Sequence, residues 1–280
     1  MGLTHDALQQ AVDWIAHADA LLVTAGAGMG IDSGLPDFRG PGGFWRAYPA
    51  LQERHMGFED IATQAAFTAT PRVAWGFYGH RLQLYRDTVP HRGFDILRAF
   101  ADRMPGGAFV YTSNVDGQFQ KAGFDATRIT ECHGSIHSLQ CQSACTSRIW
   151  SAAALIVDID PTTGLWRGDI PACQDCGRHS RPNILLFEDW SWLPARTEMQ
   201  QQRLANWLRN AGQVVTIELG AGTDIPTARR FSDRQPGPLI RINPNAPRVS
   251  RPNAIGVAAG ALETLTALQK ALILRDTRKQ

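Results

Sequence analysis

Lysine is scarce in this chain of 280 residues, which has three lysines among its 28 basic residues. Charged residues make up only 19% of the sequence, and the formal net charge is +2. A nucleic-acid-binding protein typically concentrates basic residues on one face. We therefore expect no direct nucleic-acid partner.

Long hydrophobic runs are missing as well. No apolar run approaches the roughly 20 residues of a membrane span, and the N-terminal segment lacks the basic and apolar regions of a secretory signal. We expect a cytoplasmic protein with no membrane partner. Cysteine is also sparse, and five cysteines in such a chain are more typical of metal ligands than of a disulfide framework.

Short apolar runs and helical patterns alternate along the chain. Thr4 is expected to cap an N-terminal helix, and further helices are expected over 200–210 and 261–275. Buried strands are expected at 20–23, 108–111, 214–217, 239–242 and 254–257. This alternation predicts an α/β fold with a Rossmann-like parallel sheet and helices on both faces.

Two segments, 41–91 and 135–190, interrupt this alternation. We interpret them as insertions that build a smaller domain, with a helical part and a zinc-binding module, over one edge of the sheet. The Rossmann-like domain then comprises 1–40, 92–134 and 191–280.

Three motifs follow the predicted strands. The segment 24–40 reads TAGAGMGIDSGLPDFRG, and its glycines would let main-chain N–H groups approach a dinucleotide pyrophosphate. The loop TSNVDG offers Asn114 and Asp116 to a polar ligand, although Asn-x-Asp-Gly alone is more often a turn. The motif ECHGS contains His133, which is suited to proton transfer near neutral pH, although a lone histidine is more often structural.

The cysteines form two close pairs, Cys141 with Cys145 and Cys173 with Cys176. Four thiolates in this pattern predict a closed, structural zinc site, and unrelated buried cysteines are the alternative. The fifth, Cys132, is expected to be a packing residue.

These motifs resemble those of the sirtuins, of the bacterial type, which are NAD-dependent protein-lysine deacylases with signatures such as G-A-G-x-S, S-G-I-P-D-F-R, T-Q-N-I-D-G and E-x-H-G. The resemblance spans about residues 10 to 270. It implies NAD as co-substrate, structural Zn²⁺, an acyl-lysine protein or peptide as partner, and release of nicotinamide and O-acyl-ADP-ribose.

The resemblance also implies roles for individual residues. His133 is the expected general base, and Asn114 and Asp116 complete the catalytic group. The positions expected to bind NAD are Gly26, Ala27, Gly28, Asp37, Phe38, Arg39, Ser113, Val115, Gly220, Ala221, Gly222 and Asn243.

Tyr78 and Arg81 are the residues that indicate which acyl group the substrate carries. They share one face of a predicted helix. A guanidinium suits a carboxylate, and the spacing resembles the Tyr-x-x-Arg pair of sirtuins that prefer succinyl, malonyl or glutaryl groups to acetyl. An exposed arginine beside a packed aromatic ring is the alternative. Phe187 lies in a stretch that resembles the family's peptide-docking strand and is expected to contact the substrate.

Three positions depart from the family pattern: Gly30 replaces a serine, Ser113 a glutamine and Glu188 a glycine. A glutamate at position 188 would narrow the acyl tunnel or repel an acidic acyl group. The departures keep two other functions open: an NAD glycohydrolase or ADP-ribosyltransferase, and a non-catalytic sensor of NAD or ADP-ribose.

Overall fold

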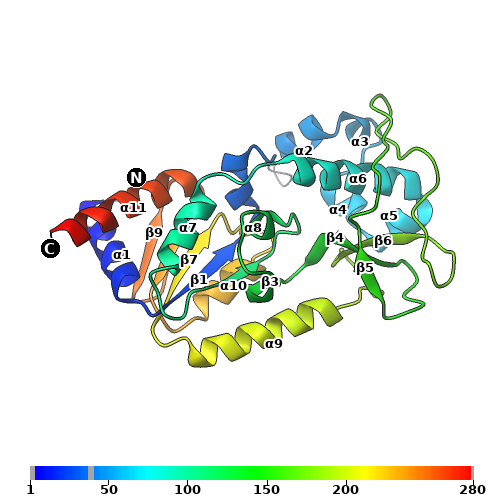
Figure 1. Ribbon diagram of the computed structural model, residues 1–280. Coiled ribbons are helices and arrows are strands. Elements are labelled where there is room, and N and C mark those ends of the chain that lie inside the picture. The colour runs from blue at the N-terminus through cyan, green and yellow to red at the C-terminus, as the bar shows by residue number, and fades with distance from the viewer. Residues whose placement is uncertain (1–3, 37–40, 279–280) are drawn as a thin grey trace.

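A six-stranded parallel sheet forms the larger of two bodies in the computed structural model, which describes residues 4–36 and 41–278 (Figure 1). The strand order is β3-β2-β1-β7-β8-β9. The strands are β1 (Ala20–Ala25), β2 (Ala108–Thr112), β3 (Ile129–Glu131), β7 (Val214–Leu219), β8 (Leu239–Ile242) and β9 (Ala254–Val257). The α/β fold and the five strands that the sequence predicts are confirmed, and β3 was not predicted.

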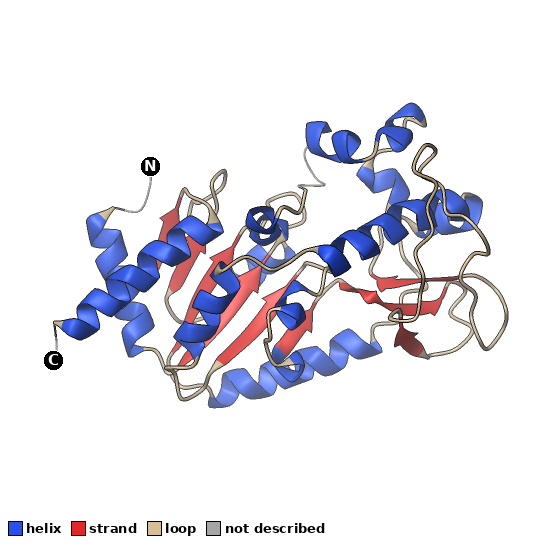
Figure 2. Ribbon diagram, turned by 45° about the horizontal axis from the view of Figure 1, so that its top comes forward, coloured by secondary structure: helices blue, strands red, loops and turns tan. Residues whose placement is uncertain are grey.

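Helices cover both faces of this sheet (Figure 2), because successive residues of each buried strand point to opposite faces. Leu21 and Val23 of β1 face one core, and Leu22 faces the other. The first core is closed by α1 (His5–His17), α7 (Gly93–Ala101) and α11 (Ala261–Thr277), and the second by α9 (Ala195–Asn210) and α10 (Thr227–Asp233). Two short helices, α8 (Gln118–Lys121) and η2 (Ala126–Arg128), connect β2 to β3. None of the helices in the described segments is long and apolar enough to cross a membrane.

The predicted N-terminal cap is present. The hydroxyl oxygen of Thr4 accepts a hydrogen bond from the backbone N–H of Ala7 at 3.3 Å, which satisfies one of the unpaired donors in the first turn of α1. Ala11, Val12 and Ile15 then fall on the buried face of the helix.

The smaller body combines helices with an antiparallel sheet of order β5-β4-β6. Its elements are α2 (Pro41–Ala47), α3 (Pro49–Glu53), α4 (Phe58–Ile61), α5 (Gln64–Ala69), α6 (Pro71–Asp87), β4 (Gly134–Cys141), β5 (Ile149–Ser151) and β6 (Ser180–Ile184). An aromatic core joins the helices to the sheet, and the indole N–H of Trp75 on α6 donates to the carbonyl of Ser180 on β6 at 3.0 Å.

The order of the large sheet places its switch point at β1. The chain runs from β1 outwards to β2 and β3, and later returns to pair β7 with the other side of β1, with Ala20 opposite Val214. Loops at the carboxyl ends of parallel strands diverge at such a point and leave a crevice there. The loops after β1, β2 and β7 therefore meet at one edge, where the smaller body also lies.

Candidate active site between the two bodies

Two glycine loops touch at this edge. After β1 the chain forms a 3₁₀ helix, η1 (Ala27–Ser33), and the N–H of Gly28 donates to the carbonyl of Gly220, which follows β7, at 3.1 Å. A Cβ atom on Gly28 would lie 2.7 Å from the Cα of Gly220, and Gly220 has φ +58. The close approach that requires these glycines is thus made by another backbone loop, and the expectation that a ligand makes it is wrong.

A cavity of about 250 Å³ lies beside these loops. The predicted NAD-binding residues in its lining are Ala27, Gly28, Gly220, Gly222 and Asn243. Gly26 and Ala221 line neither this cavity nor the larger one described below, and their carbonyls accept side-chain amide hydrogen bonds from Asn114 at 3.0 Å and Asn243 at 2.9 Å. The predicted positions Asp37, Phe38 and Arg39 lie outside the described residues.

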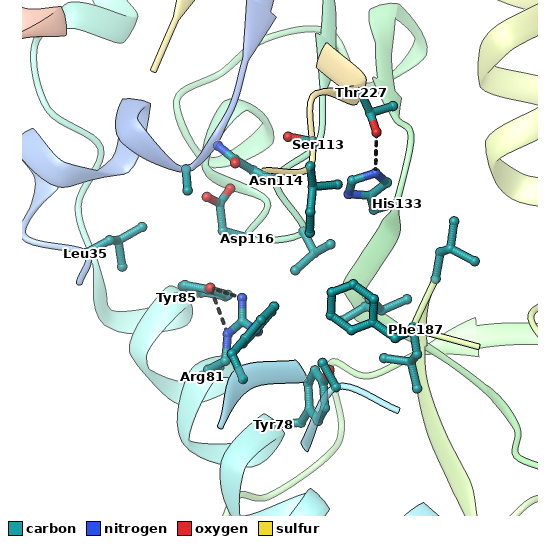
Figure 3. Close-up of a pocket in the computed structure, with 18 of the residues that line it drawn as sticks. Leu35, Tyr78, Arg81, Tyr85, Ser113, Asn114, Asp116, His133, Phe187 and Thr227 are labelled. Carbon is teal, nitrogen blue, oxygen red and sulfur yellow. Dashed lines mark hydrogen bonds between the residues drawn. The ribbon is translucent and has the colours of Figure 1, made fainter. Parts of the chain in front are cut away.

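A larger cavity of about 340 Å³ separates the two bodies and shares Ala27 with the smaller one. Figure 3 shows side chains from both bodies converging on it. The predicted residues that line it are Ala27, Tyr78, Arg81, Ser113, Asn114, Val115, Asp116, His133 and Phe187. The structure therefore brings together all three predicted catalytic residues and all three predicted substrate residues.

The loop after β2 carries Asn114 and Asp116, and local hydrogen bonds fix its shape. Asp116 accepts from the N–H of Gln118 through its side chain at 2.9 Å and from Nε2 of His137 through its carbonyl at 2.9 Å. Burial raises the pKa of Asp116 from 3.8 to about 6 and lowers the pKa of His137. A protonated Asp116 can donate a hydrogen bond into the cavity, and an ionised one can accept.

His133 lines the same cavity and is half-buried. Its Nε2 atom is 3.3 Å from the hydroxyl oxygen of Thr227, the first residue of α10 (Figure 3). Its carbonyl accepts from the N–H of Leu185. Thr227 was not predicted, since its position after Pro226 gives no sign of a contact with a residue so far away in the chain.

One face of α6 supplies the floor of the cavity. Tyr78 and Arg81 are buried there, so the alternative of an exposed arginine is wrong. Nε and Nη2 of Arg81 donate to the hydroxyl oxygen of Tyr85 at 3.0 and 2.7 Å. Tyr85 was not predicted, although its spacing of four residues from Arg81 places the two side chains side by side on a helix. Burial raises the pKa of Tyr78 to about 12, so this phenol is neutral.

The stretch after β6 borders the cavity, and its backbone N–H groups already make hydrogen bonds within the protein. The N–H groups of Leu185, Leu186 and Phe187 donate to the carbonyl of His133, to the side chain of Asp189 and to the carbonyl of Ala62. A substrate strand would therefore use the carbonyl groups of this stretch.

Glu188 does not have the position that the sequence suggests for it. It is exposed, has φ +51 and is not among the residues that line the cavity. The expectation that its side chain narrows the acyl tunnel is wrong, because the left-handed turn directs the side chain to solvent. The turn is anchored by a fully buried ion pair between Arg181 and Asp189, at 2.7 Å.

The four paired cysteines form one cluster in the smaller body, where β4 ends at Cys141. Their sulfur atoms all lie within 4.8 Å of one another, and the Cys141–Cys176 and Cys145–Cys173 pairs are 3.7 Å apart. Zinc held at about 2.3 Å by four tetrahedral thiolates requires sulfur atoms about 3.8 Å apart, so these residues fit the ion. Cys132 lies elsewhere, and burial raises the pKa of its thiol to about 12, as expected for a packing residue.

Comparison with known proteins connects this geometry to one family. The Sir2 family model matches residues 26–214. An NAD-dependent protein deacylase of Aquifex aeolicus is 29% identical over 60% of this chain and 61% of its own length. The mitochondrial NAD-dependent protein deacylase sirtuin-5 of Danio rerio is 33% identical over 46% of this chain and 40% of its own length. Both alignments thus cover less than two thirds of the relative.

The fold is shared over nearly the whole chain. A mutant of a Sir2 homologue, solved in complex with ADP-ribose, superimposes with a TM-score of 0.71 over 96% of this chain and 98% of its own length, at 22% identity.

Proposed function

Because this chain belongs to the Sir2 family, we propose that it is an NAD-dependent protein-lysine deacylase that releases nicotinamide and O-acyl-ADP-ribose. The observation that carries the proposal is the cavity of about 340 Å³, which places His133, Asn114 and Asp116 on one side and Tyr78 and Arg81 on the other. A reaction between a dinucleotide and an acyl-lysine needs both sets of groups at one point.

The two adjoining cavities fit an extended dinucleotide. They meet at Ala27, and the smaller one is lined by Gly28, Gly220 and Gly222, which have no side chains to fill it. We assign the adenosine end to the cavity beside Gly220 and Asn243, and the nicotinamide end to the cavity beside Asn114 and Asp116. NAD bound in this way supplies an electrophilic ribose carbon from which nicotinamide can depart.

His133 is the proposed general base. A half-buried imidazole at the cavity wall can take a proton from a ribose hydroxyl at neutral pH. Its Nε2 atom lies 3.3 Å from the hydroxyl oxygen of Thr227, which lines the same cavity. Asn114, whose amide is anchored on the carbonyl of Gly26, is proposed to position the ribose. Asp116 is proposed to bind the nicotinamide amide through its carboxyl group.

Arg81 and Tyr78 are proposed to select an acidic acyl group such as succinyl or malonyl. The Arg81 side chain is buried within the cavity among aromatic rings, with its guanidinium carbon 5.3 Å from the ring centre of Phe77. A carboxylate that reaches this guanidinium is bound in surroundings of low dielectric, where charge-assisted hydrogen bonds are strong.

Zinc is proposed to hold the small domain together rather than to react. A site closed by four thiolates has no open position for a substrate. The residues that would hold it are the four described above, Cys141, Cys145, Cys173 and Cys176.

The test is nicotinamide release by the purified protein from NAD, with no peptide, with an acetyl-lysine peptide and with a succinyl-lysine peptide, followed by mass spectrometry. We expect release that requires an acyl peptide, with O-acyl-ADP-ribose as co-product and the succinyl peptide preferred. His133→Ala should bind NAD and form no product. Release without peptide would instead establish an NAD glycohydrolase, and binding without release would establish a sensor.

A further inference from the structure

The hydroxyl group of Tyr85 occupies one whole edge of the Arg81 guanidinium. A guanidinium binds a carboxylate most strongly through two parallel N–H groups. On the Nε and Nη2 edge of Arg81, both of these N–H groups donate to the single oxygen of Tyr85, at 3.0 and 2.7 Å (Figure 3). The two side chains therefore act as one unit rather than as an arginine with a neighbouring tyrosine.

The hydrogen-bond donors and acceptors of Arg81 and Tyr85 determine what this pair can bind. A guanidinium has donors and no acceptor, so the phenol O–H cannot be directed back to Arg81. Two charge-assisted hydrogen bonds into the phenol oxygen also draw electron density from it and make the O–H a stronger donor. The Tyr85 O–H is thus polarised by Arg81, and any group that accepts its proton is a group other than Arg81.

The surroundings place this phenol inside the proposed reaction cavity. Tyr85 is 4% exposed and lines the same cavity as Arg81, Asp116 and His133. Aromatic rings surround the guanidinium, whose carbon lies within 6.0 Å of the ring centres of Phe58 and Phe77. A ligand that enters this end of the cavity meets a cation and a phenol donor together in an apolar enclosure.

We propose that Tyr85 is a specificity-determining residue that donates its phenol O–H to the carboxylate of an acidic acyl-lysine while Arg81 holds and polarises it. This inference rests on the proposed deacylase function and deepens it. It opposes the view that Tyr85 merely fills the carboxylate position on Arg81, in which case removal of the hydroxyl would improve binding of acidic acyl groups.

Tyr85→Phe tests the proposal, because it keeps the buried ring and removes only the hydroxyl. kcat and KM are measured with acetyl-lysine and succinyl-lysine peptides of one sequence. We expect kcat/KM for the succinyl peptide to fall on the order of tenfold, mainly through KM, and the acetyl value to fall much less. A matched control is Tyr111→Phe, since Tyr111 is a buried phenol that stacks on Phe231 and does not line this cavity; its succinyl-to-acetyl ratio should equal that of the wild type.

Binding of the same peptides by calorimetry provides a readout that does not depend on turnover. Weaker binding of the succinyl peptide by Tyr85→Phe, with acetyl binding retained, supports the proposal. Equal effects on both peptides, or a gain for the succinyl peptide, overturn it and leave the deacylase function in place. Succinyl binding that depends on Tyr85 without any nicotinamide release would instead overturn the proposed function and leave this inference standing.

Discussion

Nε2 of His133 lies 3.3 Å from the hydroxyl oxygen of Thr227, although His133 follows β3 and Thr227 begins α10, after β7. The contact ties the orientation of the proposed general base to the first residue of α10. It also gives Nε2 of His133 a hydroxyl partner that lines the same cavity.

Thr227→Val should lower kcat about fivefold, because a neutral hydrogen bond contributes about 1 kcal/mol and valine keeps the shape of threonine. KM for NAD should stay unchanged. Thr227→Ser retains the hydroxyl and should behave as the wild type. Steady-state kinetics across pH 6 to 9 would check this, and identical pH profiles and rates for the valine and wild-type proteins would contradict it.

Arg81→Met should reduce desuccinylation far more than deacetylation. Removing one partner of a buried charge-assisted contact costs about 2–5 kcal/mol, which corresponds to a loss of at least about 30-fold in kcat/KM for the succinyl peptide. Arg81→Lys keeps the charge without the planar guanidinium group. Its kcat/KM for the succinyl peptide should lie between the values of the wild type and of Arg81→Met. Equal losses with acetyl and succinyl peptides would contradict the proposed acyl selectivity.

Asp116→Asn should stabilise the protein at neutral pH. Burial raises the pKa of Asp116 from 3.8 to about 6, so between these values the folded state keeps a proton that the unfolded chain has lost. Stability contributed by this group therefore falls as the pH rises from about 4 to about 6, by on the order of 3 kcal/mol.

Urea unfolding of both proteins at pH 4.5, 6 and 7.5 would measure this effect. We expect the advantage of Asp116→Asn to be small at pH 4.5 and nearly complete at pH 7.5, while nicotinamide release declines. A difference in unfolding free energy that is independent of pH would show that Asp116 does not titrate in this range.

Cys173→Ala should release zinc and destabilise the small domain, because structural zinc contributes folding free energy directly. Elemental analysis should find about one zinc per chain in the wild type and much less in the variant. Cys132→Ala provides the control, since Cys132 is buried in another part of the molecule, and its zinc content should match the wild type. Unchanged metal content in Cys173→Ala would refute the site.

Glu188→Gly should raise the free energy of unfolding by up to about 1 kcal/mol. The backbone of Glu188 has φ +51, a conformation that glycine adopts without strain and that other residues adopt at a cost. Glu188→Ala keeps the Cβ atom and should show no gain. Chemical denaturation checks both, and a glycine variant less stable than the alanine variant would contradict this account.

The sequence predicts most of the large sheet because its strands are short apolar runs with turn residues at their ends. β3 escaped prediction because it holds one apolar residue, Ile129, followed by Thr130 and Glu131, which are buried through their hydrogen bonds to α9. Burial of polar residues is decided by partners that are distant in the chain, and no local pattern records it.

The residues of the cavity also divide into those that a local motif indicates and those that only distant contacts bring into place. Asn114, Asp116 and His133 stand in local motifs, and the sequence therefore indicates them. Tyr85 and Thr227 lie in ordinary helical surroundings, and their importance comes from contacts with Arg81 and His133 that only the folded chain creates. Local spacing could have suggested the contact of Tyr85, whereas the contact of Thr227 depends on the whole topology.

The pairing of β1 with β7, in which Ala20 lies opposite Val214, has a consequence for synthesis of the chain on a ribosome. β1 is fully apolar apart from Thr24, and one of its two hydrogen-bonding edges has no partner until nearly 200 further residues have been made. At about 5–20 residues per second this interval lasts about 10–40 s. The nascent chain therefore presents an open, aggregation-prone strand edge to chaperones for most of its translation.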